Sequence, residues 1–235
     1  TRGELHALGV PRAEVWGRGV DTAWFRPARR SAARREALGV RDDQALVLHV
    51  GRLALEKSVD TLVAAFADAR ARLGEAAIFY VAGDGPKAAW VRESLPWARH
   101  LGFLDRAVLA DLYADADLFV FPSATETCGL VALEALASGV PVIGANAGGV
   151  RENLREGLTG MLAEAGNGAS FAIRIEALVR DQVQRRAMAE AARAFAVGRD
   201  WALELDQLEA AYARLCESRT AVTAPSAWPT ITSVR

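Results

Sequence analysis

The sequence predicts an α/β protein with a Rossmann-like, doubly wound parallel sheet followed by C-terminal helices. Short apolar runs alternate with longer segments of helical period over the first two thirds of the chain. The apolar runs are continuous, which indicates strands that are buried on both faces, as in a parallel sheet. These runs stop at about residue 168. From there to residue 217 the sequence is rich in Ala, Arg and Glu, and its apolar residues recur with a helical period.

The predicted elements follow one another as repeated strand–helix–strand units. Their order is strand 45–50, helix 59–74, strand 77–83, helix 106–116, strand 117–123, helix 129–139 and strand 140–149. Helices that cross over between successive strands in this way produce parallel pairing. A chain of 235 residues that is 51% hydrophobic has enough apolar surface to bury such a core.

The chain divides into three predicted parts. Residues 1–27 are dense in Gly, Pro and Arg without a clear element, which is typical of an interdomain segment. Residues 28–217 hold the predicted sheet and helices. Residues 218–235 combine polar residues with prolines and have no periodicity, so we expect a disordered tail.

Composition excludes several classes of function. A formal net charge of -1 gives no bulk field for nucleic acid or an anionic membrane, so anion binding must be local. The two cysteines, Cys128 and Cys216, fit no disulfide framework and have no His or Cys at metal-ligand spacing, which favours a reducing cytoplasm and no metal site. No apolar run reaches the roughly 20 residues of a membrane span, although contact with a membrane surface stays open.

Ligands of doubly wound sheets bind at the carboxyl ends of the strands. Three loops fall there: residues 49–58 after the first strand, 82–86 after the second, and 122–129 before a helix. In the first loop Gly51 permits a tight turn, and Arg52 and Lys57 project cations. Charges of this kind fit a solvated surface ion cluster equally well.

The third loop favours a ligand. From Thr127 to Val150 the one charged residue is Glu134, in a helix that is otherwise Leu, Val and Ala. A buried carboxylate there needs a partner or a ligand. Glu126 precedes the helix, where the macrodipole favours an acid, and Thr127 is the predicted N-cap. Gly129 permits close approach of a phosphate to the free amides.

These residues together fit a nucleotide-sugar. Cations and helix amides suit a diphosphate, and carboxylates suit sugar hydroxyls. The Gly-rich motifs expected for ATP, GTP or NAD are not in the sequence. The stretch AGDGP, with Gly83 and Gly85, is too short for a dinucleotide motif and fits an ordinary strand-to-helix turn equally well.

The motifs GRLALEKS, AGDGP, PSATETCGLVALEALASG and the upstream GVD resemble the C-terminal half of retaining glycosyltransferases of family 4, which have the GT-B fold. The resemblance covers about residues 10 to 217. It implies that residues 28–217 are the domain that binds the nucleotide-sugar donor, without a metal or other cofactor. It also implies an N-terminal acceptor domain, with a histidine near the sugar, that this chain does not contain. We therefore expect negligible transfer by the chain alone.

The resemblance also implies roles for single residues. Arg52 and Lys57 would neutralise the diphosphate as its charge develops, and Glu126 would contact the transferred sugar. Further donor contacts are implied at Gly51, Gly83, Gly85, Phe103, Leu104, Thr127, Cys128, Gly129, Leu130, Val131 and Glu134. Among these, Phe103 and Leu104 would lie along the base, and Glu134 would hold the ribose hydroxyls.

The family transfers a hexose with retention of configuration, by attack on the face that the diphosphate leaves. The stretch 16–27 favours the GDP-mannose-dependent subgroup, which also contains sulfolipid-type synthases; a UDP-sugar is the alternative donor. Lipid, glycolipid and saccharide acceptors stay open, as does a peripheral position at the inner face of the membrane. A non-catalytic nucleotide-sugar-binding module, half of a split enzyme, and an epimerase-like enzyme of the same fold are the rival interpretations.

Two positions depart from the family pattern. Ser58 stands where a glycine is usual, and we expect it to take an ordinary helix-start conformation. Cys128 stands where an aromatic residue is commoner, so packing beside the sugar would differ.

Overall fold

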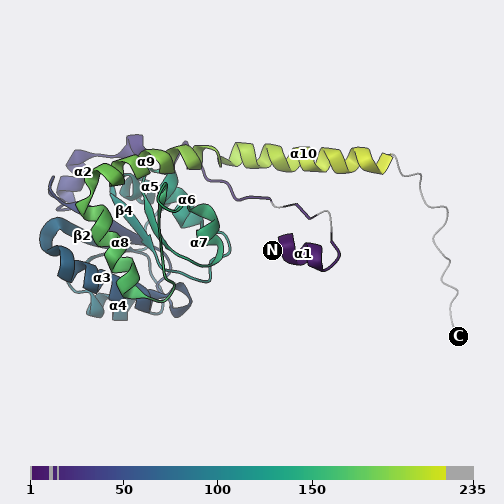
Figure 1. Cartoon of the computed structure of the whole chain (residues 1–235). Coiled ribbons are helices and arrows are strands. Elements are labelled where there is room, and N and C mark those ends of the chain that lie inside the picture. Colours follow the sequence, from purple (N-terminus) through teal and green to yellow (C-terminus); the bar gives the residue numbers. More distant parts are fainter. Residues whose placement is uncertain (1, 11–12, 15, 221–235) are drawn as a thin grey trace, which may run out of the picture. The chain divides into compact units, whose positions relative to one another are not determined.

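The computed structural model describes residues 2–10, 13–14 and 16–220. It divides into two compact units, one of residues Arg18–Trp201 and one of residues Thr1–Gly17 with Ala202–Arg235. The first unit contains the whole sheet (Figure 1).

All strand pairs of the six-stranded sheet are parallel, and the strand order is β3-β2-β1-β4-β5-β6. The strands are β1 (Ala45–Val50), β2 (Ala77–Ala82), β3 (Arg99–Gly102), β4 (Leu118–Phe121), β5 (Val142–Ala145) and β6 (Gly160–Ala163). This order is that of a doubly wound Rossmann-like sheet, which confirms the predicted fold class. The direction of winding reverses between β1 and β4, in the middle of the sheet.

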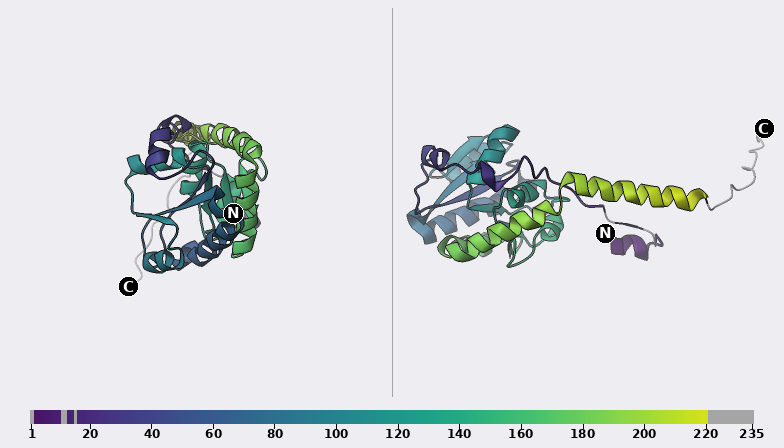
Figure 2. Two further views of the ribbon diagram at one scale, coloured as in Figure 1. Left: turned by 90° about the vertical axis from the view of Figure 1, so that its left-hand side faces the viewer. Right: turned by 90° about the horizontal axis from the view of Figure 1, so that it is seen from above.

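Helices cover both faces of the sheet (Figure 2). The unit contains α2 (Ala32–Ala37), α3 (Val59–Leu73), α4 (Ala88–Ser94), α5 (Arg106–Asp115), α6 (Leu130–Ala137), α7 (Gly148–Asn153), α8 (Gly168–Arg180) and α9 (Gln182–Val197), with 3-10 turns η1 (Pro27–Arg29), η2 (Leu55–Lys57) and η3 (Gly74–Ala76). The second unit contains α1 (Arg2–Ala7) and most of α10 (Trp201–Thr220).

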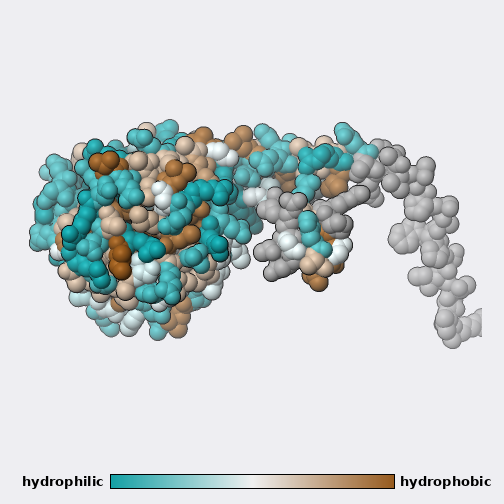
Figure 3. All heavy atoms as spheres, in the orientation of Figure 1, coloured by the Kyte–Doolittle hydropathy of each residue, from teal (hydrophilic) through white to brown (hydrophobic). Residues whose placement is uncertain are grey.

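Two apolar clusters, one on each face of the sheet, form because successive side chains of β1 point to opposite faces. Ala45 and Val47 join one cluster with α3 and α8, while Leu46, Leu48 and Val50 join the other with α5 and α6. All six residues of β1 are buried, as the continuous apolar run predicted. Hydrophilic and apolar residues are mixed over the outer face of this unit in Figure 3.

The segment before η1 packs on the sheet unit. Phe25 is 2% exposed and meets Tyr113 edge to face, with 5.8 Å between ring centroids. Val20 forms a β-bridge with Asp200. The guanidinium of Arg193 donates to the carbonyls of Thr22 and Phe25. Residues 18–27 are therefore held by long-range contacts, although they form few regular elements.

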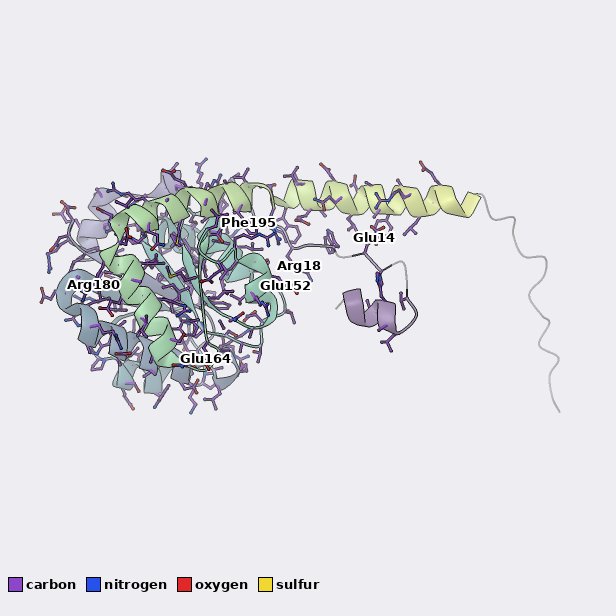
Figure 4. All side chains as sticks on the ribbon, in the orientation of Figure 1. Glu14, Arg18, Glu152, Glu164, Arg180 and Phe195 are labelled. Atoms are coloured by element: carbon purple, nitrogen blue, oxygen red, sulfur yellow. The ribbon has the colours of Figure 1, made fainter. Side chains whose placement is uncertain are left out.

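The boundaries predicted at residues 27 and 217 stay predictions. The compact unit begins at Arg18, and α10 continues to Thr220, three residues into the expected tail. Residues 221–235 lie outside the described residues. In the smaller unit, Glu14, which is labelled in Figure 4, pairs with Arg214 at 3.0 Å, and the Trp16 indole donates to the Glu204 carbonyl at 3.0 Å. In the described part of the chain, no helix is both long and apolar enough to cross a bilayer.

Candidate functional site

A cavity of about 450 Å³ opens where the winding of the sheet reverses. Its walls come from the loops that follow β1 and β4, which lie side by side in the sheet. This is the position at which open α/β sheets bind ligands. The lining contains Gly51, Arg52, Lys57 and the run from Glu126 to Val131, all of which were predicted site residues.

Lys57 and Glu126 meet at this cavity. The Lys57 ammonium donates to Oε1 of Glu126, and the two side chains are 29% and 16% exposed. The Ser123 hydroxyl donates to the same oxygen at 3.4 Å. A second link joins the loops, because the Thr125 hydroxyl donates to the Glu56 carbonyl at 2.7 Å. The cation of one loop is therefore held in place by the anion of the other.

Arg52 is a more exposed cation of the cavity than Lys57. Its side chain is 64% exposed and lies 3.7 Å from the Glu56 carboxylate, which is itself 54% exposed. Exposed pairs of this kind contribute little to stability. The Arg52 guanidinium can therefore turn toward an anion in the cavity at small cost.

The N-terminus of α6 forms the opposite wall. The helix begins at Leu130 after Gly129, which has φ 57°, and no described side chain caps it. The expectation that Thr127 is the N-cap is therefore wrong, because the chain turns through a left-handed glycine two residues later. The partial positive charge at this helix start faces the cavity without a competing side-chain oxygen.

Two glycines of α7 support the loop from Ala124 to Thr127. A Cβ on Gly149 would lie 2.2 Å from the Thr127 carbonyl, and one on Gly148 would lie 2.7 Å from the Glu126 carbonyl. The Gly149 amide donates to that Glu126 carbonyl at 2.7 Å. The sequence placed both glycines in strand 140–149, which is too long: β5 ends at Ala145.

Gly83 and Gly85 support the other loop in a similar way. They have φ of 131° and 154°, and added Cβ atoms would lie 1.9 Å from the Gly51 carbonyl and 2.5 Å from the Leu53 carbonyl. Both glycines lie behind the loop and outside the lining of the cavity. Their direct contact with a donor stays a prediction.

The model of the glycosyl transferases group 1 family matches residues 31–195. The chain belongs to this family. A GDP-mannose-dependent alpha-mannosyltransferase of Mycobacterium tuberculosis is 37% identical, over 94% of this chain and 56% of its own length. The sulfoquinovosyl transferase of Arabidopsis thaliana is 36% identical, over 84% of this chain and 40% of its own length.

A solved structure supports the same conclusion. Sucrose-phosphate synthase from Thermosynechococcus elongatus has a TM-score of 0.77 and 26% identity, covering 92% of this chain and 56% of that one. The fold is thus the Rossmann-like half of a GT-B glycosyltransferase. The chain spans about half the length of the relatives it matches.

Besides Gly83 and Gly85, three predicted donor-binding residues of this glycosyl transferase domain lie outside the cavity lining: Phe103, Leu104 and Glu134. Phe103 follows edge strand β3 and is 84% exposed, while Leu104 packs partly on the core. Glu134 lies one turn into α6 and is half-buried. Burial raises the pKa of Glu134 to about 7, against the opposing effects of Tyr113 and Arg106.

Ser58 departs from its expected conformation. It has φ 54° and ψ 44°, so the expectation of an ordinary helix start is wrong. The amide of Ser58 closes η2 on the Leu55 carbonyl, and its own carbonyl accepts the Leu62 amide of α3. The chain changes direction between these two helices through a left-handed residue. A glycine suits this conformation better than a serine.

Sequence reasoning missed three residues of the lining, Arg18, His49 and Phe121. Arg18 enters from the segment before η1 and adds a third cation (Figure 4). His49 is 1% exposed, and its Nδ1 lies 2.9 Å from the Val120 carbonyl. Burial lowers the pKa of His49 to about 4, so the ring is neutral at pH 7 and Nδ1 carries the hydrogen. Because His49 lies within an apolar strand, the sequence pattern did not indicate that its side chain lines the cavity.

Proposed function

We propose that this domain binds a nucleotide-diphosphate sugar, with GDP-mannose favoured, and supports transfer of the hexose with retention of configuration. The observation that carries the proposal is the cavity at the β1–β4 switch point. There Lys57, Arg52 and the uncapped start of α6 surround one space. The similarity to a GDP-mannose-dependent mannosyltransferase supports the choice of donor.

The Lys57–Glu126 pair gives the site a way to respond to its ligand. A diphosphate offers Lys57 a stronger partner than a single carboxylate. When Lys57 turns to the phosphate, Glu126 is released to accept a hydrogen bond from a sugar hydroxyl. Breaking the Lys57–Glu126 pair would then free Lys57 to bind the diphosphate and Glu126 to accept a hydrogen bond from the sugar.

The same groups suit the chemical step. Cleavage of the bond between sugar and phosphate places negative charge on the leaving diphosphate. Lys57, Arg52 and the α6 dipole are aimed at that charge, so they stabilise the transition state more than the ground state. In this proposal they do the work that a metal ion does in other transferases.

We propose that a lipid, glycolipid or saccharide acceptor is held by a separate acceptor domain. The relatives are about twice as long as the part that matches this chain, which supports such an arrangement. Attack by the acceptor on the face that the diphosphate leaves would give retention. A peripheral position at the inner face of a membrane follows if the acceptor is a lipid.

Calorimetry with GDP, UDP, GDP-mannose and a UDP-sugar tests the proposal. The wild type should bind GDP, and GDP-mannose should bind more tightly than a UDP-sugar. Lys57→Ala should weaken binding roughly ten-fold or more, since a charge-assisted bond contributes about 1.5–3 kcal/mol. Lys87→Ala is the matched control, because the Lys87 ammonium lies over the Trp90 ring instead.

Three outcomes would change the conclusion. Tighter binding of UDP and its sugar would replace the donor. Unchanged GDP affinity in Lys57→Ala would reject the diphosphate site. Donor binding without hydrolysis, or without transfer when an acceptor domain and acceptors are supplied, would favour a binding module over an enzyme.

A further inference from the structure

Asn153 is a buried polar residue behind the loop that leads into α6. It is the last residue of α7 and is 6% exposed. Its side-chain Nδ2 donates to the Cys128 carbonyl at 2.6 Å. Cys128 lines the cavity, whereas Asn153 is not part of the lining. The Cys128 carbonyl is therefore held on the side of the loop that faces away from the cavity.

The orientation of the Asn153 amide is fixed by a second partner. Nη1 of Arg199 donates to Oδ1 of Asn153 at 3.1 Å. A guanidinium can only donate, so the amide oxygen faces Arg199 and the amide nitrogen faces Cys128. Arg199 is itself held between α9 and α10: its carbonyl accepts the Val20 amide at 2.9 Å, and its guanidinium carbon lies 4.7 Å from the ring centroid of Phe195, which is labelled in Figure 4.

The peptide group between Cys128 and Gly129 has two edges with different surroundings. The described chain has no cis peptide bond, and the N–H of a planar trans peptide points away from its own C=O. Asn153 binds the carbonyl edge, whereas the Gly129 amide at the other edge donates to no described residue. Gly129 also lines the cavity. Its amide is therefore a free donor for an anion at the start of α6.

This peptide needs an external contact to fix its orientation. Gly129 has φ 57° and no Cβ, and glycine accepts a wide range of backbone conformations. If the peptide rotated by half a turn, the Cys128 carbonyl oxygen would replace the amide at the cavity, and its partial negative charge would repel a phosphate. The bond from Asn153 stabilises the orientation that suits an anion.

We propose that Asn153 is a positioning residue of the diphosphate site: by binding the Cys128 carbonyl, it directs the Gly129 amide to a phosphate oxygen of the bound nucleotide. Asn153 acts through the peptide and does not touch the ligand. Arg199 takes part by fixing the orientation of the Asn153 amide. The inference rests on the proposed function, in which a nucleoside diphosphate occupies the cavity.

The first experiment observes this peptide alone, without a ligand. Cys128–Gly129 is the one Cys–Gly pair in the sequence. The full chain made with carbonyl-labelled cysteine and nitrogen-labelled glycine therefore gives a single peak in an NMR spectrum that correlates each amide with the preceding carbonyl. Asn153→Leu and Asn153→Asp should both move the carbonyl carbon to lower frequency, because neither side chain can donate to the carbonyl.

Asn146→Leu, at an exposed position directly after β5, is the matched control and should leave the peak in place. Arg199→Met keeps Asn153 but removes the group that orients its amide, so it should move the carbonyl in the same direction by less. An unchanged carbonyl frequency in the folded Asn153 variants would overturn the proposal. If neither of them folds, an unchanged frequency in Arg199→Met would overturn it.

The second experiment adds GDP. In the wild type, saturating GDP should move the Gly129 amide proton of the same peak to higher frequency, as expected for an amide that donates to phosphate. In Asn153→Leu, which adds no charge, this movement should be much smaller. Its GDP affinity in calorimetry should fall roughly ten-fold, because one hydrogen bond to a charged oxygen is lost. Weaker binding with the full movement of the amide proton would mean that Asn153 only supports the fold.

The two experiments can fail separately. If the wild type binds no nucleoside diphosphate, the proposed function is wrong, and the Gly129 amide has no phosphate to bind. The carbonyl frequencies of the ligand-free variants still decide whether Asn153 orients the peptide.

Discussion

Lys57 donates to the carboxylate of Glu126 across the switch point between β1 and β4. The two residues were predicted separately, one as a phosphate contact and the other as a sugar contact. In the ligand-free protein, Glu126 therefore occupies the position where a phosphate would contact Lys57, and Lys57 occupies the position where a sugar hydroxyl would contact Glu126. A substitution at one residue should therefore change the ligand affinity of the other.

Glu126→Gln should strengthen GDP binding about two- to five-fold, because Lys57 no longer has a competing anion; such partly exposed pairs are worth about 0.2–1 kcal/mol. The same substitution should weaken the additional affinity that GDP-mannose has over GDP. Calorimetry with both ligands checks the crossed effect, and Glu152→Gln, at an exposed position on α7, is the control. Equal losses for both ligands would refute it.

Glu134→Gln should stabilise the ligand-free protein at pH 8 by about 1–3 kcal/mol. The folded pKa of Glu134 is about 7, above the value of about 4.5 in an unfolded chain. The folded state therefore holds an extra proton between these values, and stability falls as pH rises through about 7. Urea unfolding at pH 5 and pH 8 should show less of this fall in the variant. A variant as pH-sensitive as the wild type would contradict the prediction.

Ser58→Gly should raise the free energy of unfolding by about 1 kcal/mol, because Ser58 has φ 54° and glycine adopts this region without strain. Ala71→Gly, at an exposed right-handed position of α3, should instead lower it by about 0.5–1 kcal/mol. Urea unfolding of both variants gives the comparison. The idea fails if Ser58→Gly destabilises the protein.

Gly149→Ala should distort the loop beneath the cavity, since its Cβ would lie 2.2 Å from the Thr127 carbonyl. We expect weaker GDP binding and a loss of stability of about 1–3 kcal/mol, as for other overpacked sites. Gly198→Ala is the control, because its added Cβ would lie 3.5 Å from the Phe195 carbonyl and its φ is -69°. GDP affinity equal in the two variants would count against a supporting role for α7.

Cys128 should be protected from alkylation by a bound nucleotide, whereas Cys216 should not. Cys128 lines the cavity and is half-buried; Cys216 is exposed on α10. Mass spectrometry after brief iodoacetamide treatment, with and without GDP, reports both residues in one sample. Equal modification of Cys128 in the two conditions would place the nucleotide elsewhere.

The central strands were predictable because their residues are apolar on both faces. β3 and β6 were missed because they are the edge strands, with the partly exposed sequences RHLG and GMLA. α7 was missed because its first residues, Gly148 and Gly149, continue the run of small and apolar residues that begins in β5. A continuous apolar run identifies a strand that is buried on both faces, whereas a partly exposed strand or a short helix has no such run in the sequence.

The site was predictable as far as it follows from local sequence. Loops at the carboxyl ends of strands and charges near a helix start identified Lys57 and Glu126. The left-handed backbone of Ser58 was not predictable, since it depends on how η2 meets α3. His49 and Arg18 were not predictable either, because their places in the lining depend on contacts between distant parts of the chain.

The two bonds that join the loops have a consequence for how the protein folds. Lys57 to Glu126 and Thr125 to Glu56 each connect residues 69 positions apart in the chain. Closing so long a loop costs entropy before any contact repays it, and parallel pairing of this kind is slow. The cavity can form only after β4 has docked beside β1, so during refolding the recovery of GDP binding should lag behind the recovery of helical circular dichroism.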